Sequence, residues 1–284
     1  MEKIDIIKSI SERTGGDIYL GVVGAVRTGK STFIKKFIEN LVVPNIEDEY
    51  ERKRCLDEIP QTAQGKTIMT IEPKFVPSTA AKIKVEEFET NIKLVDCVGY
   101  VIPAAKGYED EMGEPRMVKT PWYDEDIPFV EAAEIGTEKV IRDHSTIGIV
   151  VTTDGSIGDI TRNNYIEAEN EVISELKEIG KPFIVLLNSA HPTLPETERL
   201  AEKLKEEHNV PVIPISAETM NEKDVYNILK EALYEFPVLN VKVDIPDWIG
   251  TLNPNHPIKK VYIDQIRECV VEVDKLRDID SINK

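Results

Sequence analysis

An octapeptide near the N-terminus restricts the possible folds of this chain more than any other segment. Gly24-Ala25-Val26-Arg27-Thr28-Gly29-Lys30-Ser31 fits the pattern GxxxxGK[ST], directly after an apolar strand-like run and directly before a stretch of helical period. Glycines let the backbone curl so that successive N–H groups and the N-terminus of the next helix face a phosphate, where the helix dipole is positive. The segment therefore predicts a phosphate-binding loop (P-loop) for a nucleoside triphosphate.

The side chains of this loop suggest specific roles. Lys30 is expected to bridge the β- and γ-phosphates, and the Ser31 hydroxyl is expected to ligate Mg²⁺. We expect the nucleotide to contact the whole loop and the residue after it: Gly24, Ala25, Val26, Arg27, Thr28, Gly29, Lys30, Ser31 and Thr32.

Apolar runs of strand length alternate with helical stretches along most of the chain, the signature of βαβ units. This pattern predicts an α/β fold with three layers, a mostly parallel sheet of six to eight strands and one antiparallel strand pair. The expected strands are Ile18–Val23, Pro73–Val76, Asn91–Val95, Ile147–Thr152, Phe183–Leu187 and Val212–Ile215, with Lys82–Phe88 as an antiparallel partner. The expected helices are Lys30–Asn40, Val130–Asp143, Tyr165–Ile179, Glu196–His208 and Glu222–Glu235.

A second polar motif, Asp96-Cys97-Val98-Gly99, ends the predicted strand that precedes it. An acid at that place lies at the carboxyl edge of the sheet, where α/β proteins bind ligands. We expect Asp96 to hold Mg²⁺, through water, and the Gly99 N–H to meet the γ-phosphate. The alternative is an ordinary turn, for which Asp and Gly are common residues.

Two connections, Leu41–Ile71 and Gly99–Phe129, are too long for ordinary α/β loops and are expected to be functional or solvated excursions. The first contains Thr67 and Thr70, whose hydroxyls could sense metal and γ-phosphate; we select Thr70 as the switch residue. The alternative is that both are ordinary loop threonines.

Charge and cysteine content exclude several classes of protein. The 35 basic and 52 acidic residues give a net charge of −17, which disfavours binding to DNA or RNA. The three cysteines, Cys55, Cys97 and Cys269, form no CxxC pair, so neither a zinc knuckle nor a disulfide framework is expected. With no signal peptide and no apolar run near the ~20 residues of a transmembrane helix, we expect a cytoplasmic protein whose membrane contact is at most peripheral.

The pattern changes after Pro237, which divides the chain into an expected P-loop domain, 1–237, and the start of a second region, 238–284. That region reads as an extended segment and then a helix from about Pro257 to the end, a helical appendage that we suspect belongs to a larger protein. Its apolar residues form a heptad-like seam or, alternatively, a face packed on its own domain: Tyr262, Ile266, Cys269, Val273 and Leu276.

The P-loop, the switch threonine and the DxxG motif together resemble the translation-factor-like branch of P-loop GTPases, over about residues 17 to 237. That family places Asn-Lys-x-Asp after its fifth strand, whereas this chain has Asn188-Ser189-Ala190-His191. His191 cannot offer the two acceptors of a carboxylate to guanine, so guanine selectivity should be lost and ATP becomes the expected substrate. Asn188 and the base-contact loop at Ser216 and Ala217 are retained.

Tyr100 stands where small GTPases place the glutamine that orients the attacking water. Hydrolysis should therefore be slow, or be completed by another group. Arg27, Lys66 and Arg116 are candidates to stabilise transition-state charge, although each could be an ordinary surface cation.

Several segments, among them TGGDIYLGVVGAVRTGKSTFIKKF, LVDCVGY and HSTIGIVVTTDG, resemble the stage IV sporulation protein A family. The resemblance implies Mg²⁺-dependent ATP hydrolysis, with Lys30 as Walker A lysine, Asp96 as Walker B acid and Thr70 as sensor. It also implies self-assembly into a cytoskeleton-like basement layer of the spore coat, on the mother-cell side of the outer forespore membrane. The implied partners are a small amphipathic membrane peptide and coat proteins. The alternatives are a regulatory GTPase and a structural scaffold that binds nucleotide without turnover.

Overall fold

The structure, a computed structural model, describes residues 3–60, 73–86, 88–105, 107–109, 113–271 and 273–282. The chain divides into two compact units, Met1–Ala232 and Leu233–Lys284. The predicted P-loop lies in the first unit.

The first unit is built on a six-stranded sheet with the strand order β2-β3-β1-β6-β7-β8. Five strands are parallel, and β2 at the edge pairs antiparallel with β3. The strands are β1 (Asp17–Val23), β2 (Lys74–Val85), β3 (Phe88–Asp96), β6 (Ile147–Thr153), β7 (Phe183–Asn188) and β8 (Val212–Ile215). The predicted fold, a mostly parallel sheet with one antiparallel pair, is confirmed.

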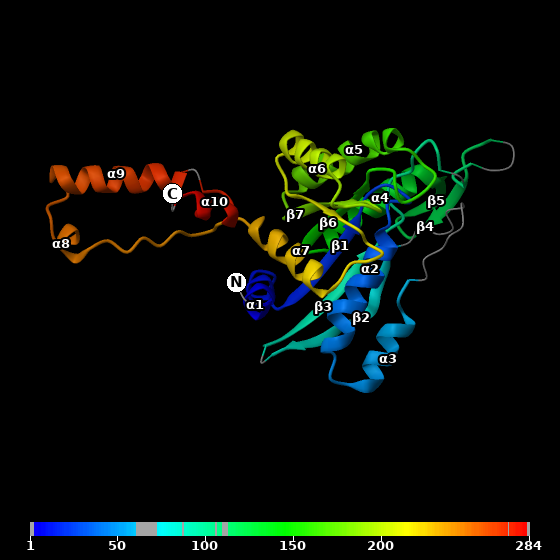
Figure 1. Ribbon diagram of the computed structural model, residues 1–284, viewed down its shortest axis with the longest axis horizontal. Coiled ribbons are helices and arrows are strands. Elements are labelled where there is room, and N and C mark those ends of the chain that lie inside the picture. Colours follow the sequence, from blue (N-terminus) through cyan, green and yellow to red (C-terminus); the bar gives the residue numbers. More distant parts are fainter. Residues whose placement is uncertain are drawn as a thin grey trace. The chain divides into compact units, whose positions relative to one another are not determined.

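Helices cover both faces of this sheet (Figure 1). They are α1 (Lys3–Arg13), α2 (Lys30–Phe37), α3 (Glu49–Asp57), α4 (Phe129–His144), α5 (Ile166–Ile179), α6 (Pro195–His208) and α7 (Glu222–Tyr234). On one face, Val140 of α4 and Val172 of α5 share an apolar cluster with Val150 of β6 and Val185 of β7. Every residue of β6 and β7 is buried, as expected of parallel strands covered on both faces. Their carboxyl ends therefore emerge at one rigid edge.

The edge strand differs from the expectation. Pro73–Val76 and Lys82–Phe88 are not separate strands: they merge into β2, whose register against β3 shifts between Val76 and Ala81. Phe88 begins β3 instead of ending its partner. Pro77 lies inside β2 and lacks an N–H, but an edge strand tolerates both a proline and an irregular register.

The long connections contain structure that the sequence pattern did not reveal. After α2 the chain continues as a π-helix (Ile38–Val42), a 3₁₀ turn (Val43–Asn45) and then α3, which Asp48 caps by accepting a hydrogen bond of 2.7 Å from the Glu51 N–H. Within the second connection, β4 (Met117–Thr120) and β5 (Tyr123–Pro128) form an antiparallel hairpin. The only buried residue of α3 is Cys55, and β5 is largely exposed, so neither element shows an apolar period.

The second unit contains an extended segment, a short α8 (Asp247–Gly250), α9 (Pro257–Val271) and α10 (Leu276–Ile282). The prediction of one helix to the chain end is wrong, because α9 ends at Val271 and α10 begins at Leu276. The Asp278 carboxylate, in the first turn of α10, accepts the N–H groups of Asp274 and Lys275 at 3.1 and 2.7 Å and so stabilises the start of the new helix. The expected heptad seam is therefore interrupted after Val271, and none of the described side chains of α9 is buried. Within the described part of both units, no helix has the length and apolarity needed to cross a bilayer.

Candidate functional site

The predicted P-loop joins the buried strand β1 to α2, and two of its glycines are required by close approach. Gly24 has φ +136°, and a Cβ there would lie 2.2 Å from the carbonyl oxygen of Val151 in β6. Gly29 has φ +92°, and a Cβ there would lie 2.2 Å from Asn188 Nδ2 in β7. Both positions need a residue without a side chain, so the loop lies tightly against the carboxyl ends of its neighbouring strands.

The DxxG segment after β3 holds the first half of the loop. The Val26 N–H donates to the Tyr100 carbonyl at 2.8 Å, and the Tyr100 N–H donates to the Gly24 carbonyl at 3.2 Å. A Cβ at Gly99 would lie 2.0 Å from the Gly24 oxygen and 2.5 Å from Lys30 Nζ. The structure thus brings the two predicted phosphate-side motifs into direct contact.

Lys30 is 6% exposed, and its ammonium group donates to the carbonyls of Gly24 at 3.2 Å and Ala25 at 2.7 Å. Desolvation by burial lowers the pKa of Lys30, and the nearby Cys97 and Asp96 oppose this shift. The ammonium group is therefore held inside the curl of the loop, where a phosphate oxygen would be a better partner than a neutral carbonyl.

Ser31 and Asp96 form the predicted metal end of the site. Ser31 Oγ donates to Asp96 Oδ2 at 2.8 Å, while Asp96 Oδ1 is buried and makes no hydrogen bond with any described residue. Burial raises the pKa of Asp96, against the attraction of Lys30 and the hydrogen bond from Ser31.

A buried carboxylate oxygen without a partner calls for an explanation, and an ion is one. A hydroxyl and a carboxylate are the oxygen donors that Mg²⁺ prefers, so these residues fit that ion. Among the described residues, no three His, Cys, Asp or Glu side chains could together hold a metal.

Asn188 joins the P-loop to the loop after β8. Its Nδ2 donates to the Thr28 carbonyl at 2.9 Å, and its Oδ1 accepts from the Ala217 N–H at 2.9 Å. Thr28 in turn donates to the Ala25 carbonyl at 3.0 Å. The expected contact residues Asn188, Ser216 and Ala217 therefore lie at the ends of β7 and β8, on the other side of β1 from β3, which ends in Asp96.

The segment that replaces the guanine motif is closed by its own hydrogen bonds. Ser189 is fully buried, and its Oγ accepts from the His191 N–H at 2.9 Å. The His191 side chain is exposed. Next to this segment lies the loop after β6, with Asp154 and Ser156, which sequence reasoning did not select. The sequence feature that could have identified this loop is Asp154, an acid directly after the end of β6.

Tyr100 does not face the phosphate side of the site. Its side chain is 1% exposed and belongs to the apolar cluster between the sheet, α4 and α5. Burial, together with the neighbouring Glu175, raises the pKa of its hydroxyl. The consequence of this burial for hydrolysis stays a prediction.

The remaining candidates have different outcomes. Lys66, Thr67 and Thr70 lie outside the described residues. Arg27 is half-exposed with φ +64°, a conformation uncommon for a residue with a side chain. Arg116 donates to the Gly107 carbonyl at 3.2 Å and lies over the Phe129 ring at 5.3 Å, so it holds the second long connection in place.

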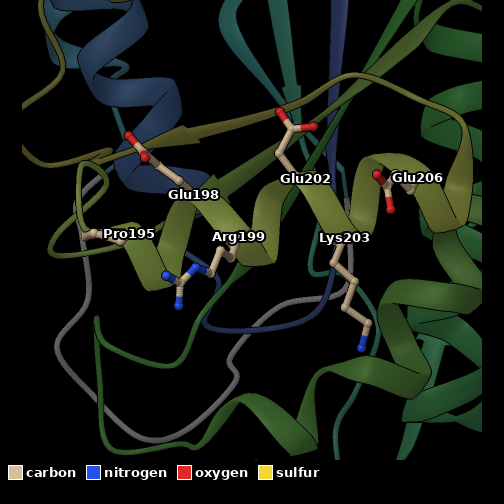
Figure 2. Close-up of a pocket in the computed structure, with 6 residues that line it drawn as sticks. All are labelled: Pro195, Glu198, Arg199, Glu202, Lys203 and Glu206. Atoms are coloured by element: carbon tan, nitrogen blue, oxygen red, sulfur yellow. The ribbon is translucent and has the colours of Figure 1, made fainter.

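A separate open hollow lies on the surface of α6 (Figure 2). Its lining comes from that single helix: Pro195, Glu198, Arg199, Glu202, Lys203 and Glu206. Arg199 and Lys203 project to one side of the helix, whereas Glu198 and Glu202 project to the other (Figure 2). This hollow has the character of a solvated helix surface.

Comparison with known proteins assigns the chain to a family. Residues 1–237 match the family described as "Stage IV sporulation protein A, ATPase domain", and residues 238–284 match "Stage IV sporulation protein A, middle domain". A crystal structure of an SsGBP mutation variant, 19% identical, covers 82% of this chain and 63% of its own with a TM-score of 0.41, too low to carry an argument.

The curated relatives agree with the family match. Proteins named stage IV sporulation protein A are 61% identical in Bacillus anthracis and 60% identical in Bacillus subtilis (strain 168), each over 99% of this chain. The protein of that name in Clostridioides difficile (strain 630) is 49% identical over 98% of the chain. The chain spans 57% of the length of each of these relatives. It belongs to the stage IV sporulation protein A family and carries that family's ATPase domain over residues 1–237.

Proposed function

We propose that the first unit binds ATP with Mg²⁺ and hydrolyses its terminal phosphoanhydride bond. The observation that carries this proposal is the buried group at the P-loop, in which the Lys30 ammonium donates to two neutral carbonyls and Asp96 Oδ1 has no described hydrogen-bond partner. A triphosphate and a divalent cation would satisfy both charges at once.

Different residues of the site are proposed to bind the phosphates, hold the metal ion and sense the γ-phosphate. Lys30 would donate to phosphate oxygens in place of the Gly24 and Ala25 carbonyls, and the loop N–H groups would orient the same phosphates. Ser31 and Asp96 would hold Mg²⁺, which neutralises charge that develops on the phosphate oxygens during transfer. Thr70 is proposed as the residue that senses the γ-phosphate.

We propose adenine as the base because the segment after β7 lacks the guanine-reading carboxylate. His191 is exposed and its N–H is already bonded to Ser189, whereas Asn188 keeps the P-loop in contact with Ala217. These contacts support a base-binding site that keeps the position of Asn188 but lacks the carboxylate that recognises guanine.

Turnover of ATP and GTP at equal concentration, measured beside Lys30→Ala and Asp96→Ala, tests the assignment. We expect ATP to be hydrolysed faster than GTP and both variants to lose turnover. Faster turnover of GTP would refute the adenine assignment, and a Lys30→Ala protein with unchanged affinity and turnover would refute the phosphate site.

A scaffold that binds nucleotide without turnover remains the second candidate, favoured by the burial of Tyr100 away from the phosphate side. Single-turnover phosphate release separates the two functions. Release within hours supports the ATPase, whereas tight ATP binding without release supports the scaffold.

We further propose that ATP hydrolysis drives self-assembly into the basement layer of the spore coat, in the mother-cell cytoplasm at the outer forespore membrane. A small amphipathic membrane peptide and coat proteins are the proposed partners. Sedimentation with ATP and with a nonhydrolysable analogue tests the coupling: assembly that is equal with both would show that occupancy is sufficient.

A further inference from the structure

The loop that follows β6 lies at the base side of the site. Thr153, the last residue of β6, pairs with Asn188, the last residue of β7, so Asp154 leaves the sheet beside the segment that replaces the guanine motif. Ser156 Oγ lies 3.3 Å from Ser189 Oγ and accepts a hydrogen bond of 2.9 Å from the Ala190 N–H. The two loops are therefore directly connected.

The Asp154 carboxylate receives its two short hydrogen bonds on one oxygen, so Oδ2 is the more weakly bonded of the two. Its Oδ1 accepts from the Ser156 N–H at 2.9 Å and from the Ser156 hydroxyl at 2.6 Å, whereas Oδ2 receives a long contact of 3.4 Å from Thr197 Oγ1. Burial alone would raise the pKa of Asp154, but the hydrogen bonds from Ser156, Ser189 and Thr197 lower it. The group is a carboxylate at neutral pH, with acceptor sites and no donor.

Ile157 brings an apolar surface to the same place. Its Cδ1 lies 3.7 Å from the position that a Cβ on Gly29 would take, next to Asn188, and 37% of its surface is exposed. An exposed branched side chain at the end of a phosphate loop offers a flat purine ring an apolar contact.

The loop is also held rigidly at its far end. The Arg162 guanidinium donates to Thr152 Oγ1 at 3.0 Å and to the Thr153 carbonyl at 3.2 Å, and it pairs with the buried Glu169 at 2.7 Å. The loop is therefore already ordered before a base binds to it, which lowers the entropic cost of binding.

We propose that residues 154–157 read the base: the Asp154 carboxylate accepts a hydrogen bond from the 6-amino group of adenine, and Ile157 packs on the ring. Guanine carries an oxygen at the same ring position. Because this oxygen and the carboxylate are both hydrogen-bond acceptors, they would repel each other. The loop would thus select adenine by attraction and reject guanine by repulsion. This inference rests on the proposed ATP site.

The proposed hydrogen bond is tested by removing the Asp154 carboxylate from the protein and the 6-amino group from the nucleotide. Binding is measured for ATP, for purine riboside triphosphate, which lacks the 6-substituent, and for inosine triphosphate, which carries a 6-oxo group. Asp154→Ala should weaken ATP about ten- to a hundredfold, the range for a hydrogen bond to a charged group, and leave purine riboside triphosphate unchanged. Asp154→Asn, whose amide can donate, should raise the affinity for inosine triphosphate relative to ATP.

Asp159→Asn serves as the control, because it removes the same charge from an exposed position on the same loop. It should change none of the three affinities. An equal loss of affinity for ATP and purine riboside triphosphate in Asp154→Ala would show that Asp154 only supports the loop, and would overturn the inference alone. If the unaltered chain binds none of the triphosphates, the proposed function fails and the inference fails with it.

Discussion

Replacing Asp96 by Asn removes a negative charge from a half-buried residue whose Oδ1 is buried, and keeps an oxygen that can accept the Ser31 hydrogen bond. In the nucleotide-free protein the unpartnered Oδ1 carries a desolvation cost of about 1–3 kcal/mol. An amide at this place has a smaller cost, so Asp96→Asn should raise the free energy of unfolding by ~1 kcal/mol. A residue retained at such a cost is expected to act only when the ligand is bound.

Nucleotide should reverse the order of stability. At a Mg²⁺–ATP concentration a hundred times the dissociation constant, binding stabilises the wild-type chain by about 2.7 kcal/mol. If the variant binds a hundredfold more weakly, the same concentration adds only about 0.4 kcal/mol. Urea unfolding with and without Mg²⁺–ATP measures both quantities. Asp57→Asn, an exposed acid at the end of α3, is the control and should match the wild-type chain.

The effect of pH on this comparison has a defined sign. Burial raises the folded-state pKa of Asp96 above the ordinary value of 3.8, so its ionised form destabilises the fold. The gain from Asp96→Asn should be absent below pH 3.8 and grow as the pH rises through the folded-state pKa. The reasoning is refuted if the variant is less stable without ligand, or if Mg²⁺–ATP stabilises it as much as the wild-type chain.

Three further predictions concern the loop and its surroundings. Gly29→Ala should lower the free energy of unfolding, measured in urea, by at least ~1 kcal/mol more than Gly113→Ala does. Both glycines have positive φ, but only a Cβ at position 29 would lie against Asn188. Equal losses in the two variants would contradict this reasoning. Tyr100→Phe should leave kcat within about twofold in steady-state ATPase assays because its hydroxyl is buried away from the phosphates, so a tenfold loss would refute that placement. Lys30→Met should be more stable than the wild-type chain at pH 7, and because burial lowers the pKa of Lys30 the difference should shrink toward pH 10.5; unfolding curves with a constant difference would exclude this cause.

The sheet could be predicted from the sequence where burial is continuous. β1, β6 and β7 are mostly apolar and mostly buried because both faces are covered, so their runs stand out against the helices between them. α3 and the β4–β5 hairpin were missed because they bury few side chains and have no apolar period. The end of α9 was missed because the Asp278 carboxylate, and not a proline or glycine, stabilises the start of the next helix.

The proposed phosphate side of the site could be predicted from the sequence alone, since a P-loop is a local structure whose glycines, lysine and serine stand in one octapeptide. The base side was decided by tertiary structure. Asp154 and Ser189 are 35 residues apart in the chain, as are Thr153 and Asn188, and they become neighbours only because β6 and β7 pair in parallel and end at the same edge. Short-range patterns can specify a loop, but the side chains that gather where several strands end depend on the register of the sheet.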